Sequence, residues 1–223
     1  MWIDEIELQQ LLTVYGKLKP IKGLSLGLIL DFELSQSQLI KKILTHMKDQ
    51  EIFEQFSICE HEKLHVCMMP LLCNEYRVPE SWSIHIPMDV SYNEIKSTLS
   101  SYFEESFSEQ PYRLKFKEVC IIANKLSIRI EAADVETIHT LEAMQDFVLK
   151  TLGFRMFGLK HFDMRIHLGI CNFDPLNDLN TEITDFILQI TEDIKQNFGI
   201  LKLDGANILE HSSLLDVEEI IIP

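Results

Sequence analysis

Apolar residues recur at intervals of three and four in four separate stretches of the chain. This spacing is typical of amphipathic helices that turn one face to a core. Each stretch opens on a residue that favours a helix N-terminus, and glycine follows two of them. We therefore predict helices from Ser35 towards Phe56, from Ser91, from Asp134 to Gly153, and from Asn180 to Gly199.

Runs of alternating or continuous apolar residues lie between these helices, and such runs predict strands. The predicted strands cover residues 24–32, 63–69, 82–88, 112–118, 126–131, 162–171 and 217–222. Strands that alternate with helices indicate an α/β or α+β sheet domain, of which we favour α+β. Pro87 should lie at an edge or a strand end, because proline cannot donate to a ladder.

The order of these elements repeats along the chain. In each half a strand leads to a helix and then to a strand that contains a histidine, His65 in the first half and His167 in the second. From helix start to histidine there are 30 residues in one half and 33 in the other. A duplication of this kind would place the two histidine strands side by side about a pseudo-twofold axis.

We predict a single domain over 1–223. An N-terminal helix covers 1–20, where an amphipathic stretch ends near Gly16 and Pro20. The first lobe covers 21–110 and the second lobe 111–223, which divides the chain between the two repeated units.

Charge narrows the range of partners. The 223 residues include 20 Lys and Arg against 35 Asp and Glu, for a net charge of −15. A surface this acidic repels long nucleic acids and anionic membranes, whereas one small phosphate ester held in a pocket stays compatible with it. No apolar run approaches the roughly 20 residues that cross a bilayer, so we expect no membrane span. A protein partner remains open.

Five cysteines are present, an odd number without the spacing of a disulfide framework: Cys59, Cys67, Cys73, Cys120 and Cys171. The acidic start of the chain does not look like a cleavable signal region. We therefore expect a reducing compartment and a cytoplasmic location.

The histidine strands carry the candidate chemistry. Side chains alternate along a strand, so each histidine should share its face with the residue two positions on, Cys67 or Gly169. Two imidazoles in one cleft can act as general acid and base near neutral pH. Arg165, two residues before His167, could bind a phosphate from the same face, although pairing with a carboxylate is the alternative.

This layout resembles the two-histidine (2H) phosphoesterase superfamily, which includes RNA 2′,3′-cyclic phosphodiesterases and RNA ligase-like proteins. The resemblance covers residues 24–222 and implies duplicated βα lobes with two antiparallel-rich sheets around a central cleft. It implies His65 and His167 as catalytic residues, and Cys67, Gly169 and Arg165 as substrate-binding residues. In that superfamily a Thr or Ser follows each histidine by two positions, whereas this chain has Cys67 and Gly169.

The resemblance implies hydrolysis of a small 2′,3′-cyclic or 2′,5′-linked nucleotide by metal-free His/His acid-base catalysis, with no cofactor. A thiol is a weak donor and glycine has no side chain. Loss of one donor aimed at the transition state commonly costs about 10²–10³-fold in rate. The alternative is a catalytically inactive 2H-fold protein that binds a nucleotide or a protein partner through the cleft.

Two other interpretations compete with this one. Cysteines and histidines gather between Cys59 and Cys73, where zinc would favour thiolate and imidazole ligands. Their spacing differs from that of a paired zinc knuckle, so we favour structural cysteines and expect no metal. His85 is a second candidate for the first motif, but Pro87 occupies the hydroxyl position, which favours a structural role for His85.

Overall fold

A curved antiparallel sheet forms the centre of the computed structural model, which describes residues 20–74, 77, 79, 82–107, 110–122, 124–154, 163–171, 181–213 and 215–219. Within these residues eight strands follow the order β7-β4-β5-β6-β3-β1-β8-β9, and a ninth, β2, pairs with β6. The strands are β1 (Gly23–Ile29), β2 (Phe56–Ile58), β3 (His65–Cys73), β4 (Pro111–Ile122), β5 (Lys125–Ala132), β6 (Arg165–Cys171), β7 (Ile200–Asp204), β8 (Asn207–His211) and β9 (Val217–Glu219).

The sheet consists of two wings that meet at one backbone pair. One wing is β7-β4-β5-β6 and the other is β3-β1-β8-β9, and they join where Cys67 of β3 pairs with Arg165 of β6. The two sheets expected from the sequence are therefore the halves of one continuous sheet. Antiparallel strands with separate helices confirm the α+β class.

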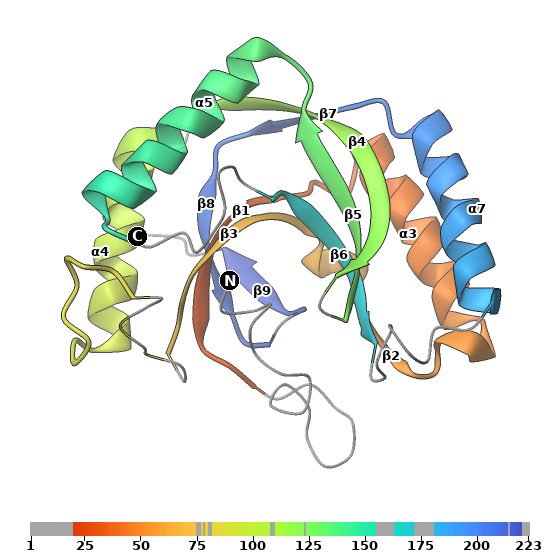
Figure 1. Cartoon of the computed structure of the whole chain (residues 1–223), viewed down its shortest axis with the longest axis horizontal. Helices are drawn as coiled ribbons and strands as arrows, with labels where there is room; N and C mark the ends of the chain where they lie inside the picture. Colours follow the sequence, from red (N-terminus) through yellow and green to blue (C-terminus); the bar gives the residue numbers. More distant parts are fainter. Residues whose placement is uncertain are drawn as a thin grey trace.

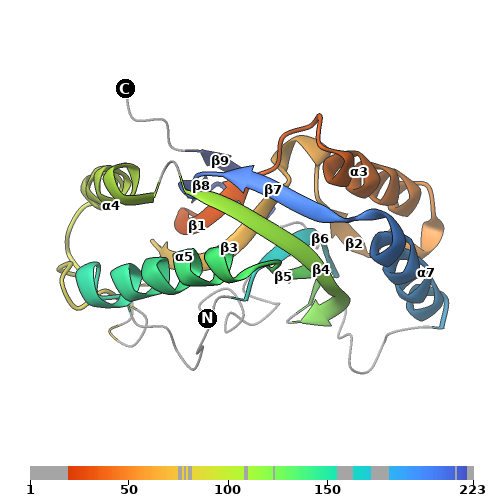
Figure 2. The ribbon, with the colours of Figure 1, turned by 90° about the horizontal axis from the view of Figure 1, so that it is seen from above.

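Four α-helices of the described chain flank the sheet: α3 (Ser35–Lys48), α4 (Tyr92–Phe107), α5 (Val135–Asp146) and α7 (Thr181–Asn197). Figures 1 and 2 show α3 and α7 together at one end of the molecule, and α4 and α5 at the other end. α7 packs on β4, whereas α4 packs on β8. Among the described residues no helix has the length and apolar character needed to cross a membrane.

Two helix ends follow simple local chemistry. The Asp134 carboxylate accepts a hydrogen bond of 2.9 Å from the backbone N–H of Thr137, which caps the first turn of α5. After α7 the chain reverses at Gly199, whose φ of +61° is a conformation that glycine adopts without strain.

The core lies between the helices and the sheet. Apolar residues of neighbouring strands are fully buried there, including Leu26, Leu126, Ile128 and Ile166. Because these side chains alternate with polar residues on the same strands, the opposite face of the central strands is left to the polar groups described below.

The halves of the chain exchange strands. β8 and β9 come from the second half of the sequence, yet they extend the wing that begins with β1 and β3. The boundary predicted between 110 and 111 separates the repeated units along the chain, but in space the second unit contributes to both wings. The predicted helix over 1–20 falls almost wholly outside the described residues.

Some predicted elements differ from the structure. The helix from Ser35 ends at Lys48. Residues 82–88 do not form a strand, because the Trp82 indole donates to the carbonyl of Ile86 and folds the segment on itself. The prediction omitted β2, β7 and β8, although Leu201 and Leu203 of β7 alternate with exposed residues in the pattern of a half-buried strand.

Candidate functional site

His65 and His167 lie at the junction of the two wings. Cys67 of β3 pairs with Arg165 of β6. Because the strands are antiparallel, moving two residues along each strand from this pair brings His65 opposite His167. Directly opposed residues of an antiparallel pair point to the same face of the sheet. Both side chains are buried, at 3% and 8% exposure, and protonation of His65 would lower the pKa of His167.

The His65 ring is held in one tautomer. Its Nδ1 lies 2.9 Å from the carbonyl oxygen of Lys63, which can only accept, so Nδ1 carries the hydrogen. Nε2 therefore carries a lone pair, and it is buried without a hydrogen-bond partner in the described part of the chain. Burial lowers the pKa of His65, which keeps the ring neutral at pH 7. A neutral, fixed imidazole with an unused lone pair has the form of a general base.

The His167 ring is held by a different partner. Its Nδ1 lies 2.8 Å from Oγ of Ser127, and that hydroxyl donates to the carbonyl of Lys125 at 3.4 Å. With its hydrogen directed to Lys125, the hydroxyl accepts from Nδ1–H of His167. Nε2 is thus the atom of His167 that can exchange a proton with a ligand.

Positive groups surround His167. Its pKa is lowered well below the usual value by burial first, and then by Lys125, His65, Arg165 and His211. The Lys125 side chain is buried at 2% exposure and Arg165 at 9%. His65 and His211 are neutral at pH 7, so the cationic neighbours among these four are Lys125 and Arg165. In a molecule of net charge −15, this region attracts an anion more strongly than the acidic surface does.

Arg165 also pairs with a carboxylate. Its Nε donates to Oδ2 of Asp163 at 3.0 Å, and Asp163 in turn accepts from Nε of Arg129 at 2.9 Å. Arg129 and Arg165 are register partners on β5 and β6. Arg165, predicted from the sequence as a phosphate ligand, therefore lies near the histidines, but its guanidinium already pairs with Asp163.

A third histidine was missed by the sequence reasoning. The ring of His211 lies 6.1 Å from that of His65, centroid to centroid. Its Nδ1 donates to the carbonyl of Ser213 at 3.3 Å, and its Nε2 accepts from Oγ of Ser25 at 2.7 Å. Burial lowers its pKa to about 3. His211 reaches the site only because β8 lies beside β1, which no local motif indicates.

The residues two positions after each histidine, Cys67 and Gly169, differ in placement. Cys67 is buried at 8% exposure and shares the face of His65, as predicted. At Gly169 the expectation fails, because the register between β5 and β6 shifts and Gly169 pairs with Leu126 instead of following the face of His167. An added Cβ at Gly169 would lie 3.0 Å from the carbonyl oxygen of Ser57, so β2 occupies that space.

The competing interpretations find less support. The described residues contain no group of three or more His, Cys, Asp or Glu side chains placed to hold a metal ion. Cys59 is buried, which raises the pKa of its thiol to about 12, and none of the five cysteines, all within the described residues, forms a disulfide. His85 is exposed on the loop between β3 and α4, away from the histidine pair.

We expect the protein to lose stability in mild acid. The folded state keeps His211 neutral, so its contribution is complete above the unfolded pKa of about 6.5 and is lost as pH falls towards 3. At pH 5, protonation of this residue in the unfolded state lowers the free energy of unfolding by about 2 kcal/mol. In His211→Gln, which can still hydrogen-bond Ser25, the difference in unfolding free energy between pH 7.5 and pH 5.0 should shrink by about that amount in urea titrations. The exposed His139→Gln should leave the difference unchanged, and an equal effect of both variants would contradict the assignment.

We expect that a side chain with a hydroxyl group at position 169 destabilises the fold. Gly169→Thr should lower the free energy of unfolding by about 1–3 kcal/mol, because the new side chain collides with the backbone of β2. Gly169→Ala, which adds only the Cβ, should lower the free energy of unfolding by a smaller amount. Wild-type urea midpoints for Gly169→Thr would show that β2 is not fixed against β6.

The fold is shared with a protein of solved structure, ATU0111. A conserved protein of unknown function, ATU0111 from Agrobacterium tumefaciens str. C58, superposes with a TM-score of 0.79 at 12% identity, over 95% of this chain and 90% of that chain. TT0787 of Thermus thermophilus gives 0.48 at 12% identity, over 88% and 97%. Usb1 of Kluyveromyces marxianus, in its structure with uridine monophosphate, gives 0.41 at 13% identity, over 92% and 99%. The search of curated proteins gave no match.

The first half of the chain identifies the family. Residues 15–125 match the family model described as "2H-phosphodiest: Domain of unknown function (DUF1868)". The matched stretch includes β1, α3 and the β3 strand that carries His65. The chain belongs to the two-histidine phosphoesterase superfamily, as a divergent member in which Cys67 and Gly169 stand at the motif hydroxyl positions.

Proposed function

We propose that the junction of the wings binds a small phosphate ester, and that His65 and His167 hydrolyse a 2′,3′-cyclic or 2′,5′-linked nucleotide. The observation that carries this proposal is the opposed pair of buried imidazoles, of which His65 holds an unpartnered Nε2. The buried cationic side chains of Lys125 and Arg165 near these imidazoles suit an incoming phosphate anion.

The tautomers support a division of labour. Nε2 of His65 takes a proton from water, and the water oxygen forms a bond to phosphorus. The bond between phosphorus and the leaving ribose oxygen breaks, and protonated His167 gives its Nε2 proton to that oxygen. The product is a phosphate monoester with a free hydroxyl, and the two histidines have exchanged protonation states. A proton passed between them through solvent restores the site.

The bound anion supplies the missing proton on His167. In the free protein burial and neighbouring cations depress its pKa, so the acid form is scarce at neutral pH. A phosphate next to the ring reverses the sign of the local field and raises that pKa. Substrate binding and protonation of the general acid are therefore coupled.

Charge takes the place of the absent hydroxyls. Cys67 offers a weak donor and Gly169 none. Lys125 and Arg165 are buried cations beside His167, and we assign the ammonium of Lys125 to the phosphate oxygens. Cys67 and Arg165 share the histidine face and could contact a bound phosphate. Gly169 instead allows β2 to pack closely against β6.

A non-catalytic binding protein is the alternative function. The loss of both motif hydroxyls and the depressed pKa of His167 favour it. In that case the same face would hold a nucleotide or a protein segment without turnover. Five cysteines that form no disulfide fit a reducing compartment such as the cytoplasm, for either function.

Asparagine variants separate catalysis from folding. In His65→Asn the amide nitrogen replaces Nδ1 as the donor to Lys63, and the residue lacks Nε2. We expect hydrolysis rates of 2′,3′-cyclic nucleotides to fall about 10²-fold or more in His65→Asn, and likewise in His167→Asn. His85→Asn, on an exposed loop, is the matched control.

Each outcome of that assay decides between the functions. Wild-type rates in both histidine variants would sink the mechanism. A wild-type protein that binds inorganic phosphate without hydrolysing any cyclic nucleotide would favour the binding alternative.

Removal of the buried ammonium tests the phosphate contact. Lys125→Met should weaken inorganic phosphate binding about 10-fold or more, because a hydrogen bond to a charged group contributes about 1.5–3 kcal/mol. It should also raise the pKa of His167, since the foremost positive neighbour is gone. Calorimetry and histidine NMR titrations measure the two effects. Lys115→Met, an exposed lysine paired with Glu131, should change neither, and unchanged phosphate affinity in Lys125→Met would refute the contact.

A further inference from the structure

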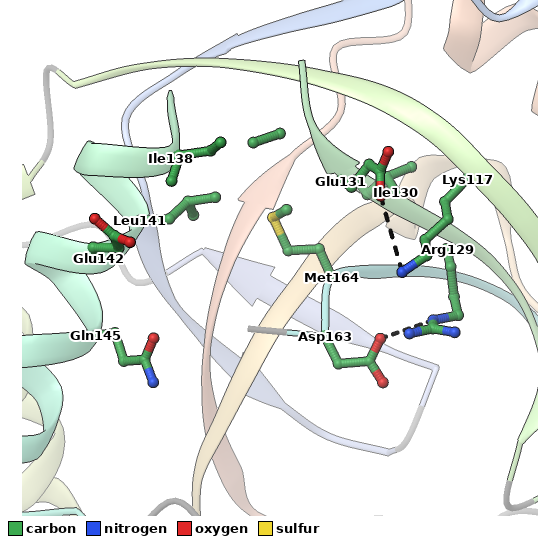
Figure 3. A pocket seen from close by; sticks show the side chains of 11 residues that line it. Lys117, Arg129, Ile130, Glu131, Ile138, Leu141, Glu142, Gln145, Asp163 and Met164 are labelled. Atoms are coloured by element: carbon green, nitrogen blue, oxygen red, sulfur yellow. Dashed lines mark hydrogen bonds and ion pairs between the residues drawn. The ribbon is translucent and has the colours of Figure 1, made fainter. Parts of the chain in front are cut away.

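Asp163 lies between two arginines near the face of the sheet that carries His65 and His167. Its carboxylate accepts from Nε of Arg129 at 2.9 Å and from Nε of Arg165 at 3.0 Å. Arg129 and Arg165 are register partners on β5 and β6, so one carboxylate bridges two neighbouring strands. Figure 3 shows the pair of Asp163 and Arg129 at the wall of a cavity of about 310 Å³, which leaves room beside it for a substituted side chain.

This carboxylate compensates a cation of the candidate site. Burial alone would raise the pKa of Asp163, but the guanidiniums of Arg165 and Arg129 hold that pKa below its usual value, so the group is ionised at neutral pH. Arg165 lies two residues, about 7 Å, from His167 along β6. The side chains of Arg165 and Asp163 are only 11% and 19% exposed, so solvent screens their charges weakly. Glu118 pairs with Arg129 on the next strand.

The field of Asp163 reaches the residues that hold His167. Cys120 of β4 lies opposite Ser127 of β5, whose hydroxyl contacts the His167 ring. Burial is the main cause that raises the pKa of the Cys120 thiol, and Asp163 is among the charges that raise it further. A phosphate beside His167 would lie in the same field, and Asp163 would repel it.

We propose that Asp163 determines which charge state of a phosphate ester the histidine site prefers, favouring singly charged diesters over doubly charged monoesters. The inference rests on the proposed function and assigns it a specificity-determining residue. The Coulomb energy of a ligand near Asp163 is proportional to the charge of the ligand, so the carboxylate disfavours a dianion twice as strongly, in free energy, as a monoanion. Hydrolysis of a cyclic diester turns a monoanion into a dianion. Asp163 therefore promotes release of the product.

Two small probes separate ligand charge from the organic group. Dimethyl phosphate is a monoanion, whereas methyl phosphate carries about two negative charges at pH 8.0, because the second pKa of a phosphate monoester is about 6. NMR titrations that follow the histidine rings measure both affinities. In Asp163→Asn, which keeps an oxygen acceptor for the arginines, we expect dimethyl phosphate to bind about 3-fold and methyl phosphate about 10-fold more tightly than in the wild-type protein.

A second variant changes the charge in the opposite direction. Arg129→Gln removes a positive charge next to Asp163, so it should weaken methyl phosphate binding more than dimethyl phosphate binding, and it keeps the inference testable if Asp163→Asn does not fold. Glu192→Gln is the matched control, because it removes one carboxylate charge from an exposed ion pair with Lys195 on α7. We expect it to change neither affinity.

The inference and the proposed function fail in different ways. Equal gains for the two probes in Asp163→Asn, or wild-type affinities for both, would overturn the role of Asp163 while the phosphate site stands. If no histidine resonance of the wild-type protein responds to either probe, the phosphate site itself is wrong, and the role of Asp163 falls with it.

Discussion

The two wings of the sheet pair at Cys67 and Arg165, and the geometry of the candidate site depends on this contact. One histidine lies on each wing, and this register gives the two a shared face. With it, His65 and His167 come opposite each other on neighbouring strands. The helices pack outside this junction, and the strand exchange of β8 commits both halves of the chain to one core.

Duplication places the histidines, but the halves have diverged around them. Opposite His167 lies Ser127, which fixes the imidazole, whereas Ile29 lies opposite His65 and cannot. The backbone of Lys63 replaces that hydroxyl contact for His65. The second half also contributes the buried Lys125. Polar chemistry is therefore concentrated on β5 and β6, which explains why the two rings are suited to different proton-transfer steps.

The sequence was sufficient for the main helices, most strands and the duplication, because each follows from periodicity and caps at particular residues such as Asp134. It also indicated the pairing of His65 and His167. Two features escaped it for a physical reason: they depend on contacts between distant segments. His211 joins the site through the pairing of β8 with β1, and the register shift beside Gly169 turns that residue from the expected face. The alternation of side chains along a strand, read from the sequence, does not reveal where a β-bulge interrupts it.

Burial and net charge act in opposite directions on this site, and the balance between them determines what it can bind. The acidic exterior discourages long polyanions, whereas the histidine site is flanked by the buried cations Lys125 and Arg165, the second of which is paired with Asp163. Desolvation keeps the histidines neutral until an anion arrives, because an isolated imidazolium in this setting is costly. If a phosphate binds there as proposed, its charge favours uptake of a proton by His167, so we expect affinity to rise as pH falls below neutrality, until protonation linked to His211 destabilises the fold.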